Sequence, residues 1–313
     1  MRLDRIGVIG ASQVAACLGL SHWQTPEQER QNILTGRWDT PPRKTTDPKY
    51  LGQKLEPACL GLLQDWLIEH GFGSEGQIEV VPWDLSVPEM ERTNGRRPSL
   101  VHPDIPWLRA TPDAPVRMGQ MQALAQSKVP TRGQLGDTPE RWGDADESRP
   151  MEDLDRWGIP RIYAVQMTVE LGVARACDWP VEWNFAPVLG LPGRFFDVWP
   201  LEFSQAAFDG LLERLVPWYE RHIRDGEPCP PATVQEAVSR HPRKPVARVD
   251  AETEQLLRRR VTTQDELKRL EAALERMDMQ ILAAVQGGAV IYGSSGRIGT
   301  MTGRRFRPDN KWR

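Results

Sequence analysis

The alternation of helical and strand patterns along the chain is the feature that most constrains its fold. Helical periodicity of apolar residues covers residues 12–18, 25–36, 47–70, 160–176 and 203–224. Runs typical of strands cover residues 78–83, 107–116, 120–128, 181–187 and 195–200. Helices and strands mixed in this order predict the α/β (α+β) class, with a central mixed sheet flanked by helices.

Two of the predicted helices carry local start signals. Thr25 precedes Pro26 and stands three residues before Gln28, an arrangement typical of a capped helix. That helix is expected to stop near Gly36, because glycine commonly ends helices. Ser12 is the predicted cap of the first helix.

Two segments lack these patterns and divide the chain. Residues 131–157 are rich in Gly, Asp, Pro and Glu and are expected to form a mobile insertion. Residues 227–249 contain five prolines and read as a linker. We therefore predict a core domain at 1–245 and a separate helical region at 246–313.

The region after the linker carries a heptad pattern. Apolar residues recur at alternating spacings of three and four at Leu267, Leu270, Leu274, Met277, Ile281 and Ala284. This spacing predicts a coiled coil or helical hairpin, although an ordinary helix packed on the core remains an alternative. Residues 287–313 are expected to form a short β-hairpin and a basic tail that either contacts phosphates or stays solvated.

Composition excludes several classes of protein. The chain has 313 residues, a net charge of −3 and no apolar run long enough to cross a membrane. We expect a soluble cytoplasmic protein, because the start only faintly resembles a signal peptide. The cysteines lie too far apart for a zinc or iron–sulfur motif, at Cys17, Cys59, Cys177 and Cys229. If DNA is the substrate, its phosphates must meet a local basic surface.

One pair of neighbouring strand patterns carries residues suited to phosphodiester chemistry. Asp113 is expected on one strand, and Gln126 and Lys128 on the same face of the next, joined by a turn at Met118-Gly119. Hydrolysis needs hard oxygen ligands for Mg²⁺, an activated water and positive charge near the phosphate. Taken alone, an Asp followed by this short string is a weak signal, because such strings recur by chance and a solvated strand face is the more common explanation.

Further motifs surround these residues in a consistent order. They are Ile9-Gly10-Ala11-Ser12 with Arg5 seven residues before the Ser, Gly52-Gln53-Lys54-Leu55-Glu56-Pro57, Thr111-Pro112-Asp113, and Pro160, Tyr163 and Gln166 at fixed offsets. In this order the sequence, from about 5 to 188, resembles the YqaJ-type and lambda-type phage exonucleases of the PD-(D/E)XK nuclease superfamily. The resemblance implies a restriction-endonuclease-like core.

The resemblance also implies roles for particular side chains. Metal ligation would fall to Asp113, Glu56 and the residue at 126 in its Glu form, and Lys128 would orient or activate the attacking water. Gln166 would support the nucleophile or the scissile phosphate. The 5′-terminal phosphate would lie near Arg5, Ser12 and Thr111, since a guanidinium and hydroxyl groups suit a phosphate.

The function implied by this family is a Mg²⁺- or Mn²⁺-dependent deoxyribonuclease that degrades one strand of double-stranded DNA ends in the 5′ to 3′ direction. Its expected partners are the DNA end and a phage single-strand annealing protein, in a bacterial host cell. Some members of the family are ring-shaped trimers, so a homo-oligomer is expected. A ring would hide a basic channel inside an acidic exterior.

Position 126 departs from the family, because Gln126 stands where the family has Glu. An amide is a weaker Mg²⁺ ligand than a carboxylate, so metal affinity and hydrolysis should both fall. Three interpretations remain: a Glu→Gln substitution introduced to hold substrate, a natural variant of weak activity, or a DNA-end-binding protein without catalysis. A structure-specific endonuclease with the same core and an interaction scaffold built on the coiled coil are further alternatives.

Overall fold

The computed structural model divides into two compact units, residues 1–240 and 241–313, and each is described by itself. The described residues are 6–36, 48–83, 99–130, 142–190, 195–233, 236, 250–284, 290–293, 296–302 and 305–308. Within these ranges, no helix is both long enough and apolar enough to span a membrane.

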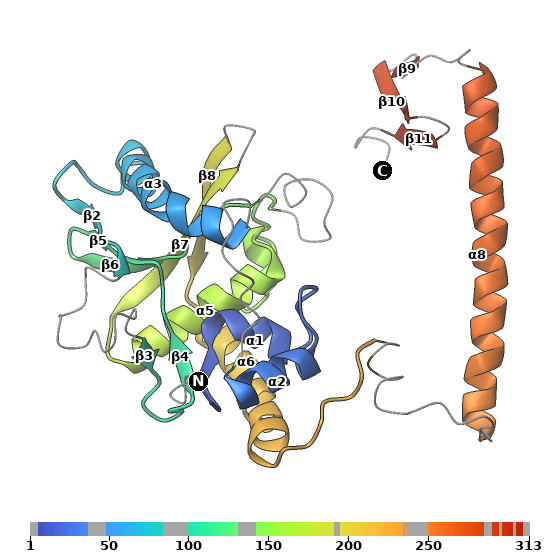
Figure 1. Cartoon of the computed structure of the whole chain (residues 1–313). Coiled ribbons are helices and arrows are strands. Elements are labelled where there is room, and N and C mark those ends of the chain that lie inside the picture. Colours follow the sequence, from blue (N-terminus) through green and yellow to red (C-terminus); the bar gives the residue numbers. More distant parts are fainter. Residues whose placement is uncertain are drawn as a thin grey trace. The chain divides into compact units, whose positions relative to one another are not determined.

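A five-stranded mixed sheet forms the centre of the first unit (Figure 1). Its strands, in spatial order, are β2 (Ile78–Val80), β5 (Ala114–Met118), β6 (Met121–Ala125), β7 (Val181–Gly190) and β8 (Phe195–Glu202). Strands β6 and β7 run parallel, and the other neighbours run antiparallel. The predicted β5–β6 hairpin is confirmed, and Gly119 turns it with a φ of +61°.

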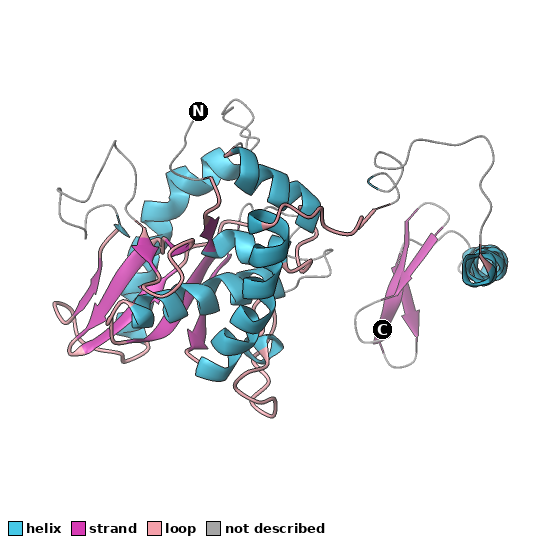
Figure 2. Cartoon of the chain, turned by 90° about the horizontal axis from the view of Figure 1, so that it is seen from below, coloured by secondary structure: helices cyan, strands magenta, loops and turns pink. Residues whose placement is uncertain are grey.

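Helices cover both faces of this sheet (Figure 2). Helix α3 (Pro48–Glu69) packs on one face and α5 (Arg161–Ala176) on the other. Successive side chains of a strand point to opposite faces, so Ala123 and Ala125 share a core with α3 while Leu124 packs with α5. The predicted mixed sheet flanked by helices is therefore confirmed.

A smaller sheet extends the first unit. It has the order β1-β4-β3 and is made of β1 (Ile9–Gly10), β3 (Leu100–Val101) and β4 (Leu108–Ala110), with β1 and β4 parallel. Helices α1 (Ala11–Cys17) and α6 (Gln205–Tyr219) share a core with this sheet and α5. Because β1 and β4 are parallel, their C-terminal ends lie at the same edge of this small sheet.

The predicted cap of α2 (Pro26–Thr35) is confirmed. The Thr25 hydroxyl accepts a hydrogen bond from the backbone N–H of Gln28, whose side chain accepts from the backbone N–H of Thr25. The prediction for Ser12 was wrong, because Gly10 is the N-cap of α1. The side-chain oxygen of Gln13 accepts the Gly10 N–H at 2.8 Å and so does the work expected of a cap hydroxyl.

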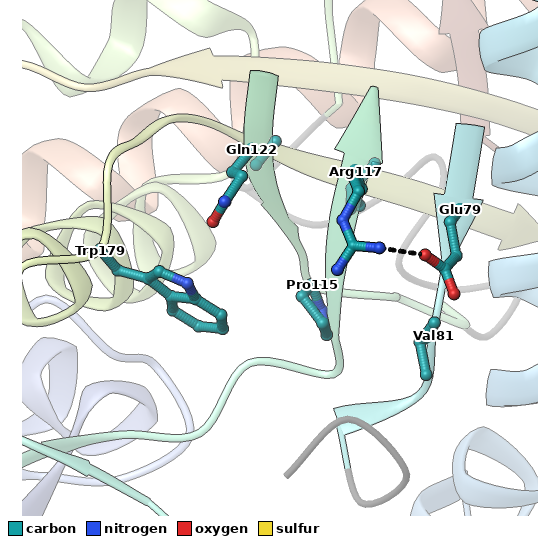
Figure 3. Close-up of a pocket in the computed structure, with 8 residues that line it drawn as sticks. Glu79, Val81, Pro115, Arg117, Gln122 and Trp179 are labelled. Carbon is teal, nitrogen blue, oxygen red and sulfur yellow. Dashed lines mark hydrogen bonds and ion pairs between the residues drawn. The ribbon is translucent and has the colours of Figure 1, made fainter. Parts of the chain in front are cut away.

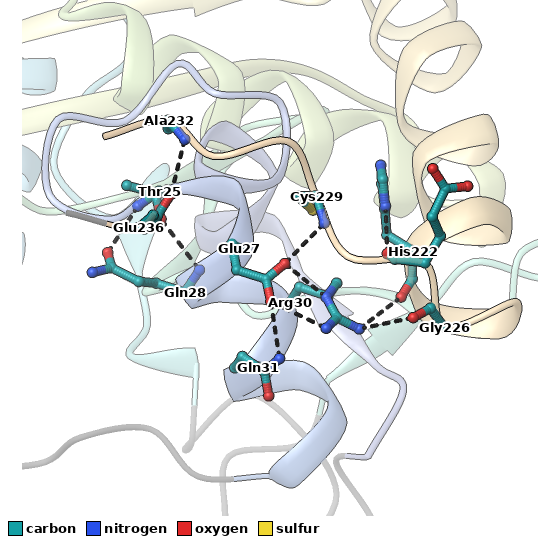
Figure 4. A network of polar contacts seen from close by, with 11 residues as sticks. Thr25, Glu27, Gln28, Arg30, Gln31, His222, Gly226, Cys229, Ala232 and Glu236 are labelled. Atoms are coloured by element: carbon teal, nitrogen blue, oxygen red, sulfur yellow. Dashed lines mark hydrogen bonds and ion pairs between the residues drawn. The ribbon is translucent and has the colours of Figure 1, made fainter. Parts of the chain in front are cut away.

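Helix α2 also binds the segment that follows α6 (Figure 4). This N-terminal clamp consists of Glu27, Arg30, Gln31, His222, Gly226 and Cys229. The carboxylate of Glu27 accepts hydrogen bonds from the side chains of Arg30 and Gln31 and from the backbone N–H of Cys229. Arg30 in turn donates to two backbone carbonyls around η6 (Glu220–Arg224).

The second unit consists of a helix and a small sheet. Helix α8 (Ala251–Ala284) is followed by the antiparallel strands β9 (Val290–Gly293), β10 (Gly296–Thr302) and β11 (Arg305–Pro308). The structure therefore has three strands here, whereas the expected hairpin has two. The heptad residue Leu270 is 68% exposed, and the coiled coil stays a prediction.

Candidate active site

Asp113 lies immediately before β5, where its carboxylate gathers three hydrogen bonds. Its Oδ2 accepts from the side-chain amide of Gln126 at 2.8 Å, and from the backbone N–H and hydroxyl of Ser127 at 2.8 and 3.1 Å. The β5–β6 register, which pairs Ala114 with Ala125, places Asp113 opposite Gln126. The hairpin thus brings together two of the predicted site residues.

The predicted strands needed a correction here. The expected strand at 107–116 is broken into β4 and β5, and residues 111–113 lie between them. Pro112 has no N–H to give to a ladder, which favours such a break. Gln126 and Lys128 follow the end of β6, but both stay aligned with β7 because their N–H groups donate to the carbonyls of Phe185 and Pro187.

Lys128 projects from this extended segment toward helix α5. Its ammonium donates to the side-chain oxygen of Gln166 at 3.3 Å and lies 4.9 Å from the centre of the Tyr163 ring. Burial lowers the pKa of Lys128, and the negative charges of Asp113, Glu170 and Glu56 oppose that shift. The cation is therefore held by an amide, an aromatic face and nearby carboxylates.

A chain of buried polar groups continues from Gln166 into the core. Its Nε2 donates to Glu170 at 2.8 Å, and Glu170 also accepts from Asn184 of β7 at 3.0 Å. Burial raises the pKa of Glu170 to about 7, against the opposing effects of Lys128 and the two amide donors. Glu170 and Asn184 were not among the residues predicted from the sequence. A charged residue one turn after Gln166, on an otherwise apolar helix, was the signal that could have found Glu170.

Glu56 reaches the same region from helix α3 and is only 9% exposed. Its charge acts on Lys128 together with that of Asp113. Both carboxylates also act on the thiol of Cys59, whose pKa burial raises to about 12. Glu56 and Asp113 are therefore both near enough to Lys128 and Cys59 to act on their pKa values.

A divalent ion would need several hard oxygen ligands from these residues. Among the described residues, no group of three His, Cys, Asp or Glu side chains could hold a metal. The side-chain oxygen of Gln126 is nevertheless buried without a hydrogen-bond partner, which is uncommon for a buried polar atom. This amide oxygen and the carboxylates of Asp113 and Glu56 are all of the hard oxygen type that Mg²⁺ and Mn²⁺ bind.

The predicted phosphate-binding residues are only partly placed. Thr111 follows β4 and its hydroxyl lies 2.7 Å from that of Ser99. Ser12 is exposed in α1, and the β1–β4 register, which pairs Gly10 with Arg109, brings Ser12 and Thr111 to the same edge of the small sheet. Arg5 lies outside the described residues.

A separate cavity of about 320 Å³ lies over β2, β5 and β6 (Figure 3). An ion pair of 2.7 Å between Arg117 and Glu79 crosses its floor, and Trp179 and Gln122 border it. Asp113, Lys128 and Gln166 do not line it. The candidate site is therefore the hydrogen-bonded cluster at the strand ends and not this cavity.

Comparisons with known proteins gave structural likenesses alone. No protein-family model and no curated protein matches the chain. The chain is similar to an alkaline exonuclease (LHK-Exo) from Laribacter hongkongensis at 18% identity and a TM-score of 0.42, over 71% of this chain and 92% of that one. LHK-Exo in complex with dAMP gives the same values. A chain in a SOX–DNA complex is similar at 8% identity and a TM-score of 0.40, over 71% of this chain and 66% of that one.

Proposed function

We propose that the first unit is a divalent-metal-dependent deoxyribonuclease that digests double-stranded DNA from an end, in the 5′ to 3′ direction. The observation that carries the proposal is that the Asp113 carboxylate is bonded to Gln126, whose side-chain oxygen has no hydrogen-bond partner, and that Asp113 and Glu56 both act on the buried ammonium of Lys128. Phosphodiester hydrolysis requires that combination of hard oxygen ligands and positive charge.

The proposed roles of the side chains are those that the resemblance implies. Asp113, Glu56 and the side-chain oxygen at 126 would hold Mg²⁺ or Mn²⁺, which supplies positive charge to the phosphate when bound. Lys128 would orient the attacking water, and Gln166 holds the ammonium in place. The water oxygen forms a bond to phosphorus and gives its proton to solvent. The bond from phosphorus to the leaving oxygen breaks, and that oxygen takes a proton from solvent.

The proposal extends to the DNA end and to partners. Ser12 and Thr111 would bind the 5′-terminal phosphate together with Arg5, and their common edge supports this role. We further propose that the exposed strand passes to a phage single-strand annealing protein in the cytoplasm of a bacterial host. A homo-oligomer, such as a ring trimer, would enclose the DNA.

One contact favours a second candidate, a DNA-end-binding protein without catalysis. The amide of Gln126 donates to the carboxylate oxygen of Asp113 and so stabilises the site without any cation. A glutamate at 126 would instead repel Asp113 unless a cation lay between them. The present residue therefore suits a site that binds metal weakly.

The Gln126→Glu variant tests the two candidates against each other. It should cut a 5′-phosphorylated linear duplex in Mg²⁺ on the order of a hundredfold to a thousandfold faster than the unchanged chain, because one electrostatic element commonly has that effect. Closed circular DNA should stay intact if the enzyme requires an end. Product lengths resolved over time, with the label on either terminus, give the polarity.

Two controls isolate the metal site. Gln122→Glu makes the same charge change on β6 but lies in the separate cavity, and it should give no gain. Adding Asp113→Asn to Gln126→Glu should remove the gain. Equal, negligible cleavage by the unchanged chain and by Gln126→Glu, with binding of DNA ends retained, would support the end-binding protein.

A further inference from the structure

Glu170 is a buried acid that the proposed chemistry does not use. It is 1% exposed, lies on α5 one turn after Gln166, and has both oxygens engaged by amides. One oxygen accepts from Gln166 at 2.8 Å and the other from Asn184 at 3.0 Å. The carboxylate thus lies between helix and sheet, behind the side chains that form the candidate site.

While Glu170 is ionised and Lys128 is charged, the contacts of Gln166 allow its amide a single orientation. A lysine ammonium can only donate hydrogen bonds, and an ionised carboxylate can only accept them. Gln166 lies between the two, so its oxygen must face Lys128 and its nitrogen must face Glu170. The reverse orientation would set N–H groups against the ammonium and an oxygen against the carboxylate.

We propose that Glu170 is a positioning residue that fixes the Gln166 amide so that its oxygen holds Lys128 for the reaction. It accepts hydrogen bonds from Gln166 and Asn184, so it acts through Gln166. The catalytic part of this inference rests on the proposed nuclease function, whereas the orientation of the amide does not. An acid buried without an arginine or lysine in direct contact reduces stability, which a role in the site would explain.

A role in packing alone is the competing explanation, since Glu170 also joins α5 to β7 through Asn184. Two substitutions separate the explanations. Glu170→Leu keeps the size but leaves the Gln166 nitrogen without an acceptor. Glu170→Gln keeps an acceptor for Gln166, and its own N–H groups can donate to the side-chain oxygen of Asn184, now buried without a partner, once the Asn184 amide turns over. Thr168→Val, also buried on α5, is the matched control for packing.

The first measurement follows the side-chain amide of Gln166 by NMR in the full chain, with its signals assigned by their loss in Gln166→Leu. The amide protons should exchange slowly with water in the unchanged chain, in Thr168→Val and in Glu170→Gln. They should exchange faster and shift in Glu170→Leu. Signals that do not respond to Glu170→Leu would overturn the inference, whether or not the chain is a nuclease.

The second measurement uses kinetics in the Gln126→Glu background. Glu170→Leu should lower kcat about tenfold to a hundredfold, as expected for a misplaced group, with KM within about threefold. Glu170→Gln should restore kcat to within about threefold. In the presence of Gln166→Leu, adding Glu170→Leu should have no further effect, because a residue acting through another is not additive with it.

Each kinetic failure has a distinct meaning. Additive losses, or a Glu170→Gln variant as slow as Glu170→Leu, would overturn the positioning role while the nuclease function stands. Absence of cleavage in Gln126→Glu itself would overturn the nuclease function and the catalytic part of this inference with it. The amide signals would still decide whether Glu170 orients Gln166.

Discussion

The N-terminal clamp and the candidate site each enclose a glutamate, and the two respond to their surroundings in opposite ways. Burial alone would raise the pKa of Glu27, but hydrogen bonds from Arg30, Gln31 and Cys229 outweigh it and lower the pKa to about 2. Burial raises the pKa of Glu170 to about 7, because its direct donors are neutral amides and Lys128 acts only from a distance.

The difference shows what each region contributes. A guanidinium and several N–H donors make the ionised Glu27 a source of stability where the chain leaves α6. Glu170, by contrast, lowers the free energy of unfolding in its ionised form. We explain its presence at this position by the orientation that it gives to the Gln166 amide. Residues in functional sites commonly make the folded state less stable than other residues at the same positions would.

The largest expected effect is the dependence of stability on pH at Glu170. Its folded pKa is raised from 4.5 to about 7, so the folded state binds the proton more tightly. The contribution of Glu170 to the free energy of unfolding is fully present below pH 4.5. It is lost as the pH rises to 7, and the loss is on the order of 3 kcal/mol at most. Lys128 and Asp113 are the charged groups that face it.

Urea unfolding followed by tryptophan fluorescence measures this effect, since only Trp312 of the twelve tryptophans lies outside residues 1–240. In Glu170→Gln the fall in free energy of unfolding between pH 4.5 and 7 should be absent. If the free energies of unfolding of Glu170→Gln and of the unchanged chain differ by the same amount throughout this pH range, the contrast between Glu170 and Glu27 is wrong.

The clamp should show the opposite dependence with a smaller effect. Glu27→Gln should lower the free energy of unfolding by about 2 kcal/mol at pH 7, the scale of hydrogen bonds to a charged group. Because the folded pKa of Glu27 is lowered, its contribution is present above pH 4.5 and is lost as pH falls toward 2.

A matched control exists in the exposed pair of Glu79 and Arg117, whose side chains are 54% and 67% exposed. Glu79→Gln should change the free energy of unfolding by less than about 1 kcal/mol. Equal effects of Glu27→Gln and Glu79→Gln would show that the clamp contributes no more than a surface ion pair.

The smallest expected effect concerns the cap at the start of the clamp helix. Thr25→Ala should lower the free energy of unfolding by about 1 kcal/mol, and Thr25→Ser, which keeps the hydroxyl, should restore it. The same unfolding assay checks both variants. Cleavage by Gln126→Glu should not change when Thr25→Ala is added, and a loss of cleavage would contradict the separation of the two regions.

Local signals in the sequence predicted local features well. The capping box at Thr25 and Gln28 and the turn at Gly119 depend on neighbouring residues, and both are confirmed. The break at Pro112 was missed, because a run of apolar residues on both sides reads as one strand. For the candidate site, the sequence named Asp113, Gln126, Lys128 and Gln166, and hydrogen bonds join them in two pairs, Asp113 with Gln126 and Lys128 with Gln166.

What the sequence determined by itself was the alternation of elements and the side chains with suitable chemistry, since periodicity and residue type are properties of the chain. Only the tertiary structure decided which groups share a low-dielectric environment. Glu27 and Glu170 are the same residue type, and both lie on helices. Their pKa values shift in opposite directions because Glu27 accepts hydrogen bonds from Arg30, whereas Glu170 is fully buried and accepts from neutral amides. Burial and partners belong to the folded chain, and no local pattern encodes them.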